Sequence, residues 1–539
     1  MAFLGREQPV VSAPAGNVRL VCRVCNLLLT VWAGRATINI LPDDILLHVF
    51  LIDGQEDHYV PDSLHSPEQS GLEDYDRVRR LPWRWYRFVH VCRRWRSIVF
   101  AFPIFLDLRL VYGLWTRIEL TDIWPPLPII ITNLFDRFRP GFHMDGPWTP
   151  ARPAIPNDFD FDAAIMHPNR VREIRLFYLT RSIFQRLVSA TQMQEQFPAL
   201  AYLVLHCDGR EFDSHIPALP DGFLGGSAPF LQSLWLESIS FPALPKFLLS
   251  ATHLVRLILQ RIPHSGYFSS EAIVTGLAGM PNLESLSIQF DSPLSRPHQD
   301  SRRLPPPACT VLPALTQFKF KGVSEYLEDF VVRIDAPLLQ VDTIYIIFFH
   351  QLIYDIPRLA QFMGRMTRFQ EVKEAHVRFH NDSVHVCSTL PPISTFDRKS
   401  GLEISCRTSD WQLSSVAQVF TSFFLSIYMV NRLYIYDPSS YKLWAYKSND
   451  IDDILWLEIF HPFTGVNNLY ISNTFASSIA RALQELVGGR TMEVLPNLQS
   501  IFLAVYKPSE PIPEGIQNFV AARQLSGHPI TVSIWERVG

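Results

Sequence analysis

The chain has 539 residues and a mass of 61.9 kDa, beyond the size at which one hydrophobic core keeps growing, so we expect several structural units or a repeat array. Hydrophobic residues make up 47% and charged residues 19% of the sequence, a balance that excludes disorder over most of the chain. The formal net charge of −4 does not favour nucleic acid or an anionic membrane as a partner of the whole chain.

The cysteines and apolar segments indicate a reducing compartment. The seven cysteines are an odd number and are widely spread, which is typical of free thiols. The first residues carry no cationic stretch followed by an apolar core, so no secretory signal is expected. Residues 341–349 are too short to span a bilayer, and residues 414–430 contain Ser, Gln and Thr. We therefore expect a soluble protein of the cytoplasm and/or nucleus.

An apolar helix is predicted near the start of the chain. Residues 1–36 before it show no clear periodicity and are predicted to form an irregular extension. The stretch INILPDDILLHVF at 38–50 places Pro42 at the start of the helix and Asp43 and Asp44 in its first turn, where carboxylates favour the positive end of the helix dipole. Its apolar side chains crowd onto one side: Ile45, Leu46, Val49 and Phe50.

A second apolar helix is predicted at residues 83–100, WRWYRFVHVCRRWRSIVF. Its apolar residues recur at i, i+4, i+7 and i+11 and form one continuous face: Phe88, Cys92, Trp95 and Val99. Between the two helices, residues 53–76 are rich in carboxylates and contain neither Lys nor Arg, which predicts a solvated loop. The sequence thus predicts a helical module at 37–110 with an acidic insertion at 53–82.

A repeated phrase organises the rest of the chain. Residues 111–165 are rich in proline and are predicted to connect the helical module to the repeats. Over residues 166–539 the pattern x-P-x-L-x-x-L-x-L returns irregularly, and this pattern is that of a leucine-rich repeat. Clear copies lie at 197–205, 228–236, 251–259, 280–288, 312–320, 336–344 and 495–503, and weaker ones at 371–379, 430–436 and 465–471.

Each phrase predicts a short strand. Alternating apolar residues at the end of the phrase are typical of a strand that stacks on the strand of the next repeat, and the proline fixes the turn before it. Residues 269–280 suit a helix between two phrases, and residues 513–536 suit a terminal cap made of a helix closed by Gly527 and a last strand. We expect an α/β solenoid, with a layered sheet of unrelated α/β units as the alternative.

The two helical stretches carry a resemblance to a known family. LPDDILLHVF at 41–50 and FVHVCRRWRSIVF at 88–100 closely resemble an F-box, and the chain is similar to the F-box proteins abundant in mushroom-forming fungi. Three further segments support this likeness: FLDLRLVYG at 105–113, PPLPIII at 125–131 and GIQNFVAARQLSGHPITVS at 515–533. The family has a short link where this chain has the insertion at 53–82, which is tolerable because loop-closure cost grows only logarithmically with length.

The resemblance implies an all-α, three-helix F-box module that docks onto the Skp-type adaptor of a cullin–RING (SCF-type) ubiquitin ligase, followed by an irregular leucine-rich-repeat-like α/β solenoid. The implied function is that of a non-catalytic substrate receptor, whose repeats bind a target protein for ubiquitination and degradation. Helix-in-groove recognition uses apolar anchors, and a short module has little interior in which to bury them. The residues that match the docking surface are Leu41, Pro42, Ile45, Leu46, Val49, Val89, Cys92, Trp95 and Ile98.

Other functions are weaker predictions. A repeat scaffold without adaptor binding, its helical pair packed on the repeats, is the main alternative. The arginines of residues 77–96 are interleaved with Trp83 and Trp85 and could contact nucleic acid, but the acidic loop before them favours a solvated charged face. Cys22 and Cys25 lack a second pair at zinc-site spacing. We expect no enzyme, cofactor or metal, and no nucleic-acid or membrane partner.

Overall fold

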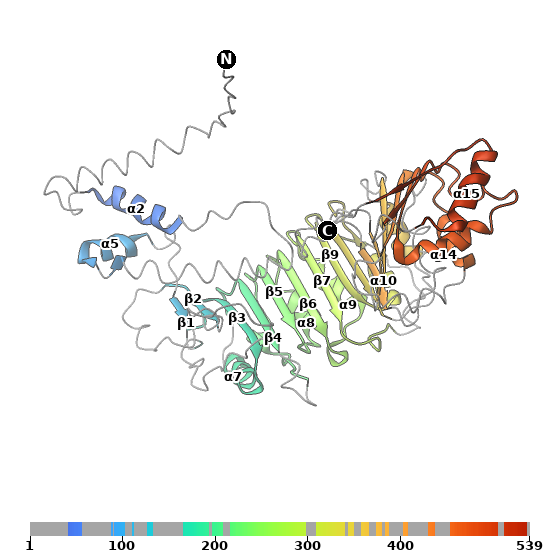
Figure 1. The fold of residues 1–539 in the computed structure, drawn as a ribbon. Helices are drawn as coiled ribbons and strands as arrows, with labels where there is room; N and C mark the ends of the chain where they lie inside the picture. Colours follow the sequence, from blue (N-terminus) through green and yellow to red (C-terminus); the bar gives the residue numbers. More distant parts are fainter. Residues whose placement is uncertain are drawn as a thin grey trace, which may run out of the picture. The chain divides into compact units, whose positions relative to one another are not determined.

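The computed structural model covers most of the repeat region and two short parts of the helical module (Figure 1). The described residues are 41–55, 88–89, 91–102, 110–112, 127–132, 165, 167–192, 197–207, 216–297, 309–339, 343–349, 357–365, 373–379, 383–387, 403–407, 429–436, 453–504 and 511–535. The predicted extension at 1–36 and most of the insertion at 53–82 lie outside them. The chain divides into two units: unit 1 is Met1–Pro61 with Arg80–Leu108, and unit 2 is Asp62–Arg79 with Arg109–Gly539.

In the described residues of unit 1, the helices α2 (Asp43–Gln55) and α5 (Arg93–Ala101) pack against each other. α2 has two acidic residues in its first turn, as the sequence predicts, and it extends three residues into the predicted insertion. The helix α5 is amphipathic, and it buries Trp95, Ile98 and Val99. The pairing of α2 with α5 brings together two stretches that the insertion separates in the sequence.

Cys92 interrupts the second predicted helix. Its backbone is extended, with φ −158° and ψ 170°, and its Sγ accepts a hydrogen bond from the Trp95 amide at 3.5 Å, so Cys92 is the N-cap of α5. The residues that are helical before it are Phe88, Val89 and Val91. The prediction of one continuous helix at 83–100 is therefore wrong, because an extended N-cap residue breaks the helical register on which that prediction was based.

Unit 2 is a mixed α/β unit built on a long sheet, which confirms the α/β class predicted for the repeats. The sheet contains 16 described strands in the order β1-β2-β3-β4-β5-β6-β7-β9-β11-β14-β13-β12-β15-β16-β17-β18, and β8 pairs separately with β10. The strands are β1 (Leu110–Tyr112), β2 (Ile129–Thr132), β3 (Val171–Leu179), β4 (Tyr202–Cys207), β5 (Ser233–Glu237), β6 (Arg256–Ile262), β7 (Ser285–Phe290), β8 (Thr310–Val311), β9 (Gln317–Gly322), β10 (Ile334–Asp335), β11 (Ile344–Phe348), β12 (Glu374–Phe379), β13 (Ser383–Cys387), β14 (Glu403–Arg407), β15 (Arg432–Tyr436), β16 (Asn468–Ser472), β17 (Ser500–Ala504) and β18 (Thr531–Ile534).

The repeated phrases coincide with the strands of this sheet. Every clear and weaker copy of the phrase overlaps a strand, as predicted. The leucine at the fourth position of each clear copy is buried ahead of its strand: Leu200, Leu231, Leu254, Leu283, Leu315, Leu339 and Leu498. The next apolar positions stand opposite one another in parallel register and form a buried ladder: Leu203, Leu234, Leu257, Leu286 and Phe318. Each buried leucine contributes about 1.5–3 kcal/mol as an upper estimate, so the ladder is a major part of the core.

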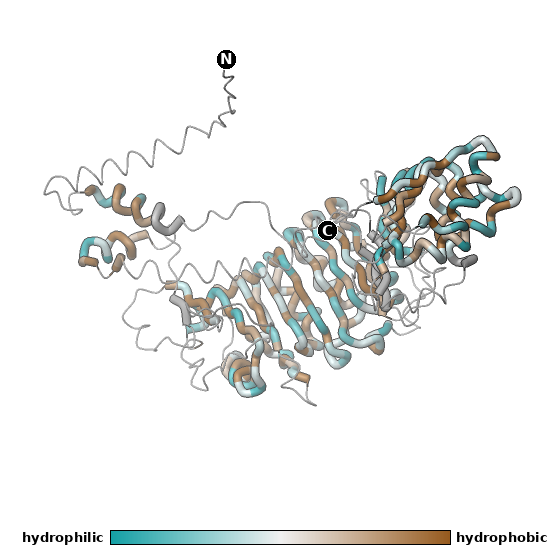
Figure 2. Tube along the Cα trace, in the orientation of Figure 1, coloured by the Kyte–Doolittle hydropathy of each residue, from teal (hydrophilic) through white to brown (hydrophobic). Residues whose placement is uncertain are grey.

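Helices connect many of the strands and pack on their neighbours in series. They are α7 (Arg181–Gln192), α8 (Leu244–Leu248), α9 (Ser270–Leu277), α10 (Ser324–Val331), α11 (Pro357–Gly364), α13 (Asp453–Phe460), α14 (Asn473–Gln484) and α15 (Glu514–Leu525), with short 3-10 turns at η5 (Phe223–Gly226) and η6 (His264–Gly266). α9 confirms the helix predicted at 269–280. α8, α9, α10 and α11 contact one another in turn, as do α13, α14 and α15. Figure 2 shows hydrophobic and hydrophilic positions alternating along the strands that these helices connect.

The sheet begins before the predicted start of the repeats at residue 166. The proline-rich segment 111–165, expected to be a connector, contains β2, whose four residues are all buried. β2 pairs with β1 on one side and with β3 on the other. Unbroken burial of this kind is typical of a parallel strand that is covered on both faces. The run of isoleucines in β2 lacks the alternation used to find the other strands.

The sheet also contains a reversal that the phrase does not predict. All described neighbouring pairs are parallel except the two that include β13, which runs antiparallel to β12 and to β14. In addition, β14 lies beside β11, and β12 lies beside β15. The strands β12, β13 and β14 therefore follow one another across the sheet in the reverse of their order in the sequence. The progression of one strand per repeat is therefore interrupted in the middle of the sheet.

The C-terminal end matches the predicted cap. α15 is followed by Gly527, whose φ of +81° is the left-handed conformation that ends many helices, and then by the last strand, β18. Arg523 on α15 is fully buried, and its guanidinium donates to the backbone carbonyls of Thr491 at 3.2 Å and Pro496 at 3.0 Å. The carbonyl oxygens provide the buried guanidinium with hydrogen-bond acceptors. Arg523 therefore links α15 to the segment before β17.

Candidate functional site

Three aromatic rings hold the two helices of unit 1 together. The rings of Phe50 and Phe88 stack with centroids 4.4 Å apart, and the ring of Trp95 lies 4.8 Å from that of Phe50 and 6.1 Å from that of Phe88. Phe50 comes from α2, and the other two rings come from the second helical stretch. Offset and tilted ring pairs contribute about 0.5–1.5 kcal/mol each beyond the area they bury. The cluster therefore accounts for the pairing of the two motif halves across the insertion.

A polar tie supports the same pairing at the start of α2. The guanidinium of Arg94 donates to the Asp43 carboxylate through Nε at 2.8 Å and Nη2 at 2.5 Å, and Nη2 also lies 2.5 Å from the Leu41 carbonyl oxygen. Arg94 thus links α5 to the first turn of α2. Because the two side chains are 35% and 63% exposed, the pair is screened by solvent and contributes no more than about 1 kcal/mol.

The nine predicted docking residues divide into two groups in unit 1. Four of them are buried within the fold, with exposed fractions of 8% or less: Leu46, Val89, Trp95 and Ile98. The others reach the surface fully or in part: Leu41, Pro42, Ile45, Val49 and Cys92. Ile45, in the first turn of α2, is 41% exposed, although isoleucine is among the residues most often buried. The first group builds the helix pair, and the second group is available at its surface.

Two exposed apolar residues of the second helical stretch were not among the predicted docking residues. Val91 is 56% exposed, and Phe102, which follows α5, is 45% exposed. The break at Cys92 accounts for Val91, because a continuous helix would have placed it differently relative to Trp95. Phe102 is the C-cap of α5 and lies beyond the helix predicted at 83–100. The sequence around Cys92 does not signal the break, because cysteine is an uncommon N-cap residue.

In unit 2, four side chains from neighbouring strands meet at the ends of β3 to β6. The rings of Tyr178 and His206 lie 4.9 Å apart, and His206 Nε2 lies 3.7 Å from Glu237 Oε1. Arg261 Nη1 lies 4.0 Å from the same carboxylate oxygen, and 57% of its side chain is exposed. We name Tyr178, His206, Glu237 and Arg261 the strand-end cluster. Tyr and Arg dominate the binding energy of many protein interfaces, so the cluster is a candidate contact surface.

Backbone irregularities shape the strand-end cluster. The pairing of β3 with β4 shifts after Leu176, and the pairing of β6 with β7 shifts after Leu259. Tyr178 and Arg261 lie in these shifts, and both have a φ of 51°, in the left-handed region that non-glycine residues rarely adopt. Such residues cost about 1–3 kcal/mol each and cluster at functional sites, and bulges redirect the side chains they carry.

Four rings stack in a row across the later strands β12, β15, β16 and β17. The centroid distances are 4.3 Å from His376 to Tyr434, 4.2 Å from Tyr434 to Tyr470, and 4.5 Å from Tyr470 to Phe502. The rings are nearly parallel, with interplanar angles of 12°, 12° and 8°. Trp535 meets the ring of Tyr470 edge to face at 5.4 Å. Since the faces of the central rings are used within the row, its first role is to hold neighbouring strands together.

The first ring of this row is a buried histidine. His376 is fully buried, and neither ring nitrogen has a hydrogen-bond partner among the described residues. Burial lowers the pKa of His376 and therefore favours its neutral form. Glu374 Oε2 lies 3.6 Å from His376 Nε2, and Arg432 Nη1 donates to Glu374 Oε1 at 2.8 Å; His376 first, and Arg432 also, lower the pKa of Glu374. Burial raises the pKa of Tyr434 to about 12.

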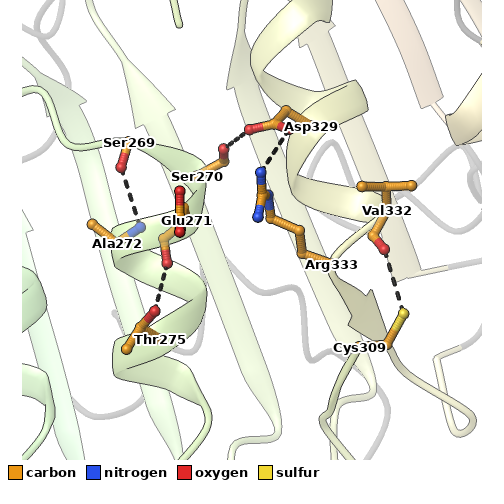
Figure 3. Close-up of polar contacts among 9 residues, drawn as sticks. All are labelled: Ser269, Ser270, Glu271, Ala272, Thr275, Cys309, Asp329, Val332 and Arg333. Carbon is orange, nitrogen blue, oxygen red and sulfur yellow. Dashed lines mark hydrogen bonds and ion pairs between the residues drawn. The ribbon is translucent and has the colours of Figure 1, made fainter. Parts of the chain in front are cut away.

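A buried polar cluster joins α9 to α10 (Figure 3). Ser270 Oγ donates to one carboxylate oxygen of Asp329, and Arg333 Nη2 donates to the other at 3.2 Å. Ser269 caps α9, its Oγ accepting a hydrogen bond from the Ala272 amide at 3.2 Å. Because the Ser270 hydroxyl donates to a carboxylate that Arg333 neutralises, the arrangement is suited to joining two repeats and not to activating a nucleophile.

The described residues contain neither a candidate metal site nor a candidate membrane span. No group of three or more His, Cys, Asp or Glu side chains there is placed to hold a metal ion, and the predicted pair Cys22 and Cys25 lies outside the described residues. Cys92, Cys207 and Cys309 are free thiols, as predicted. None of the helices in the described ranges combines the length and the apolar character that a membrane span requires.

The comparisons with known proteins leave the family open. No family model matches the chain, and no curated protein matches it. The likeness of residues 41–50 and 88–100 to an F-box therefore stays a prediction from the sequence.

Proposed function

We propose that the chain is the substrate-receptor subunit of a cullin–RING ubiquitin ligase of the cytoplasm and/or nucleus. Unit 1 is an F-box module that docks onto a Skp-type adaptor, and unit 2 is an irregular leucine-rich-repeat-like solenoid that binds the target protein. The observation that carries this proposal is the packing of α2 against α5 across the insertion, with Pro42 and Ile45 left exposed. The resemblance implies this pairing, and an insertion that separated the two halves would have removed the docking surface.

The burial pattern assigns the nine docking residues two roles within this proposal. The exposed apolar side chains, above all Ile45, contact the adaptor, together with Val91 of the second helical stretch. The positions of these contacts are fixed by four side chains buried under the surface of unit 1: Leu46, Val89, Trp95 and Ile98. An apolar anchor that is exposed in the free protein gains its full burial energy on binding, about 25 cal/mol per Å² of apolar surface covered.

The receptor carries out no bond-making step of its own. Holding a target lysine close to a ubiquitin-loaded enzyme raises the effective concentration of the lysine, and this proximity supplies the rate enhancement. Within unit 2, we assign target binding to the strand-end cluster. Its tyrosine and arginine are of the residue types that dominate interfaces, and two irregularities in strand pairing present them on β3 and β6, the first and last of the four strands that form the cluster.

Adaptor binding in cells tests the proposal. The tagged full chain is purified from cell extract, and the adaptor and cullin are quantified by mass spectrometry. The Ile45→Asp variant places a charge in the proposed contact, so neither the adaptor nor the cullin should be recovered with it. Ile512→Asp in unit 2 is the matched control, because Ile512 is 39% exposed against 41% for Ile45. Recovery of neither protein with the unmodified chain would contradict the proposal.

A non-catalytic interaction scaffold without adaptor binding is the second candidate. The burial of Leu46, Val89, Trp95 and Ile98 favours it, because these four predicted docking residues are used by the fold of unit 1 itself. The scaffold would retain target proteins on unit 2 and recover no adaptor or cullin. The same purification therefore separates the two candidates.

A further inference from the structure

An open pocket lies along the amino-terminal ends of the early strands in unit 2. Its volume is about 500 Å³, which falls within the range of about 300–1,000 Å³ typical of ligand pockets. It is lined by Pro128, Asn169, Arg170, Arg172, Pro198, Ala199, Ala201, Phe230, Gln232 and His253. Two arginines thus line the pocket, and none of these described lining residues is an aspartate or glutamate. The strand-end cluster lies at the opposite ends of the strands.

A β-bulge leaves Arg172 of β3 without a paired residue on β2. Ile129 pairs with Val171 and Ile130 pairs with Glu173, so the pairing of β2 with β3 skips Arg172. The side chain of Arg172 is exposed, while the Arg172 carbonyl still accepts a hydrogen bond from the Ala201 amide at 2.8 Å. Bulges of this kind redirect a side chain while the flanking ladder stays intact. The backbone of the sheet therefore holds Arg172 at the pocket.

The second arginine is positioned by the neighbouring strand. Arg170 Nε donates to the Leu127 carbonyl at 3.1 Å, and the Arg170 carbonyl accepts a hydrogen bond from the Ile129 amide at 2.8 Å. The guanidinium is thus held by a backbone carbonyl of the segment that leads into β2. Guanidinium groups form charge-assisted hydrogen bonds with phosphate and carboxylate oxygens, so the lining suits an anionic group.

An aromatic platform stands on the other side of the pocket. The rings of Phe230 and His253 are nearly parallel, with an interplanar angle of 9° and centroids 5.8 Å apart. Phe230 is 55% exposed, although it occupies a position of the repeated phrase where the neighbouring copies carry Ala199, His253 and Asn282. An exposed phenylalanine across the pocket from two arginines offers apolar contact to the body of a ligand whose charged end meets the guanidinium groups.

We propose that this pocket binds an organic anion, a phosphate or carboxylate group carried on an aromatic or apolar body. Arg172, with Arg170, binds the anionic group, and Phe230 packs against the body. The ligand is either a free small molecule or such a group presented by a peptide. The site is independent of adaptor docking, because every lining residue belongs to unit 2.

Calorimetric titration of the full chain with phenyl phosphate tests this inference. We expect saturable binding that weakens at least about tenfold in Arg172→Ala and falls as salt rises, since the attraction between the charges is screened. In Phe230→Ser, the affinity for phenyl phosphate should fall to the affinity for inorganic phosphate. Arg365→Ala is the control, because it removes an exposed arginine outside the pocket and should bind as the unmodified chain does.

Two comparisons complete the test. A blocked peptide that carries phosphotyrosine presents the same group on a backbone, so tighter binding of the peptide than of phenyl phosphate identifies a peptide source, and weaker binding identifies a free small molecule. Absence of saturable binding by both probes at millimolar concentration would overturn the proposal. Equal weakening in Arg172→Ala and Arg365→Ala would also overturn it, because the attraction would then be general to the protein surface.

Discussion

Unit 1 and unit 2 bury their apolar residues in different ways. In unit 2, the apolar side chains of one strand are covered by those of the next, so the leucine ladder is buried from β4 to β9. The helix pair of unit 1 has one three-ring cluster and leaves Ile45, Val91 and Phe102 exposed. Small units cannot cover all of their apolar surface, whereas a repeat array gains a new neighbour with each strand. The exposed side chains of unit 1 are therefore the ones that a partner would cover.

Loss of the central ring in unit 1 should have the largest effect. Trp95→Ala removes a side chain that is 8% exposed and contacts Phe50, at a cost of about 3–5 kcal/mol, which is enough to unfold a small helix pair. Hydrogen exchange should show loss of protection at residues 93–101 and unchanged protection at 256–262. Equal loss in both segments would mean that the two units fold as one.

Removal of the carboxylate between α9 and α10 should destabilise unit 2. Asp329→Ala leaves Arg333 buried without the carboxylate it now bonds, at a cost of about 3 kcal/mol. The urea midpoint of unit 2 should fall, while the hydrogen-exchange protection of unit 1 stays the same. Glu493→Ala, which removes the partner of the exposed Arg490, is the control and should change little. An unchanged midpoint in Asp329→Ala would show that the buried pair contributes nothing net.

Acidification should weaken unit 2 through His376. Its folded pKa is lowered from 6.5, so below about pH 6.5 the unfolded chain binds a proton that the folded unit does not, and stability falls as the pH drops. Glu374 has a lowered pKa too, and its contribution is lost only at more acidic pH, below its ordinary value of 4.5. The thermal midpoint should therefore fall between about pH 7.5 and about pH 5.5.

Substitution of this histidine gives the matching control. His376→Phe keeps a ring in the stacked row and removes the titrating group, so the midpoint should depend less on pH between these values. If the dependence were the same in His376→Phe as in the unmodified chain, another group would be its source.

The smallest effect is expected at the surface tie of unit 1. Arg94→Ala removes the hydrogen bonds to Asp43 and to the Leu41 carbonyl, and it should cost no more than about 1 kcal/mol because both side chains are partly solvated. Hydrogen exchange of α2 should be slightly faster at low salt, and the difference should shrink at high salt. A loss as large as that of Trp95→Ala would show that the tie, and not the ring cluster, holds the helices together.

Much of the strand pattern could be predicted from the sequence because each strand is signalled locally. In the copies at 251–259 and 280–288, alternating apolar residues follow a buried leucine, and each copy becomes one parallel strand. The run of isoleucines in β2 does not alternate, so it was assigned to a connector. The reversal at β13 depends on which strands pair, and pairing between strands that are distant in sequence has no local signature.

The candidate site was predictable in position and less so in detail. The apolar residues at 41–50 and 88–100 identified the helix pair, and the structure brings them together. Which of them are exposed depends on the break at Cys92 and on the rings of Phe50 and Trp95, which meet across the insertion. The pocket that contains Arg172 depends on a bulge, and the sequence shows Arg172 only as one charged residue in a strand.

Titration of the purified full chain with a purified Skp-type adaptor tests the central claim most directly. The account predicts saturable binding at micromolar concentration or below, at least about tenfold weaker in Ile45→Asp and unchanged in Ile512→Asp, with the hydrogen-exchange protection of α2 and α5 retained in both variants. No binding by the unmodified chain, or equal binding by Ile45→Asp, would contradict the claim that the exposed face of unit 1 docks onto the adaptor.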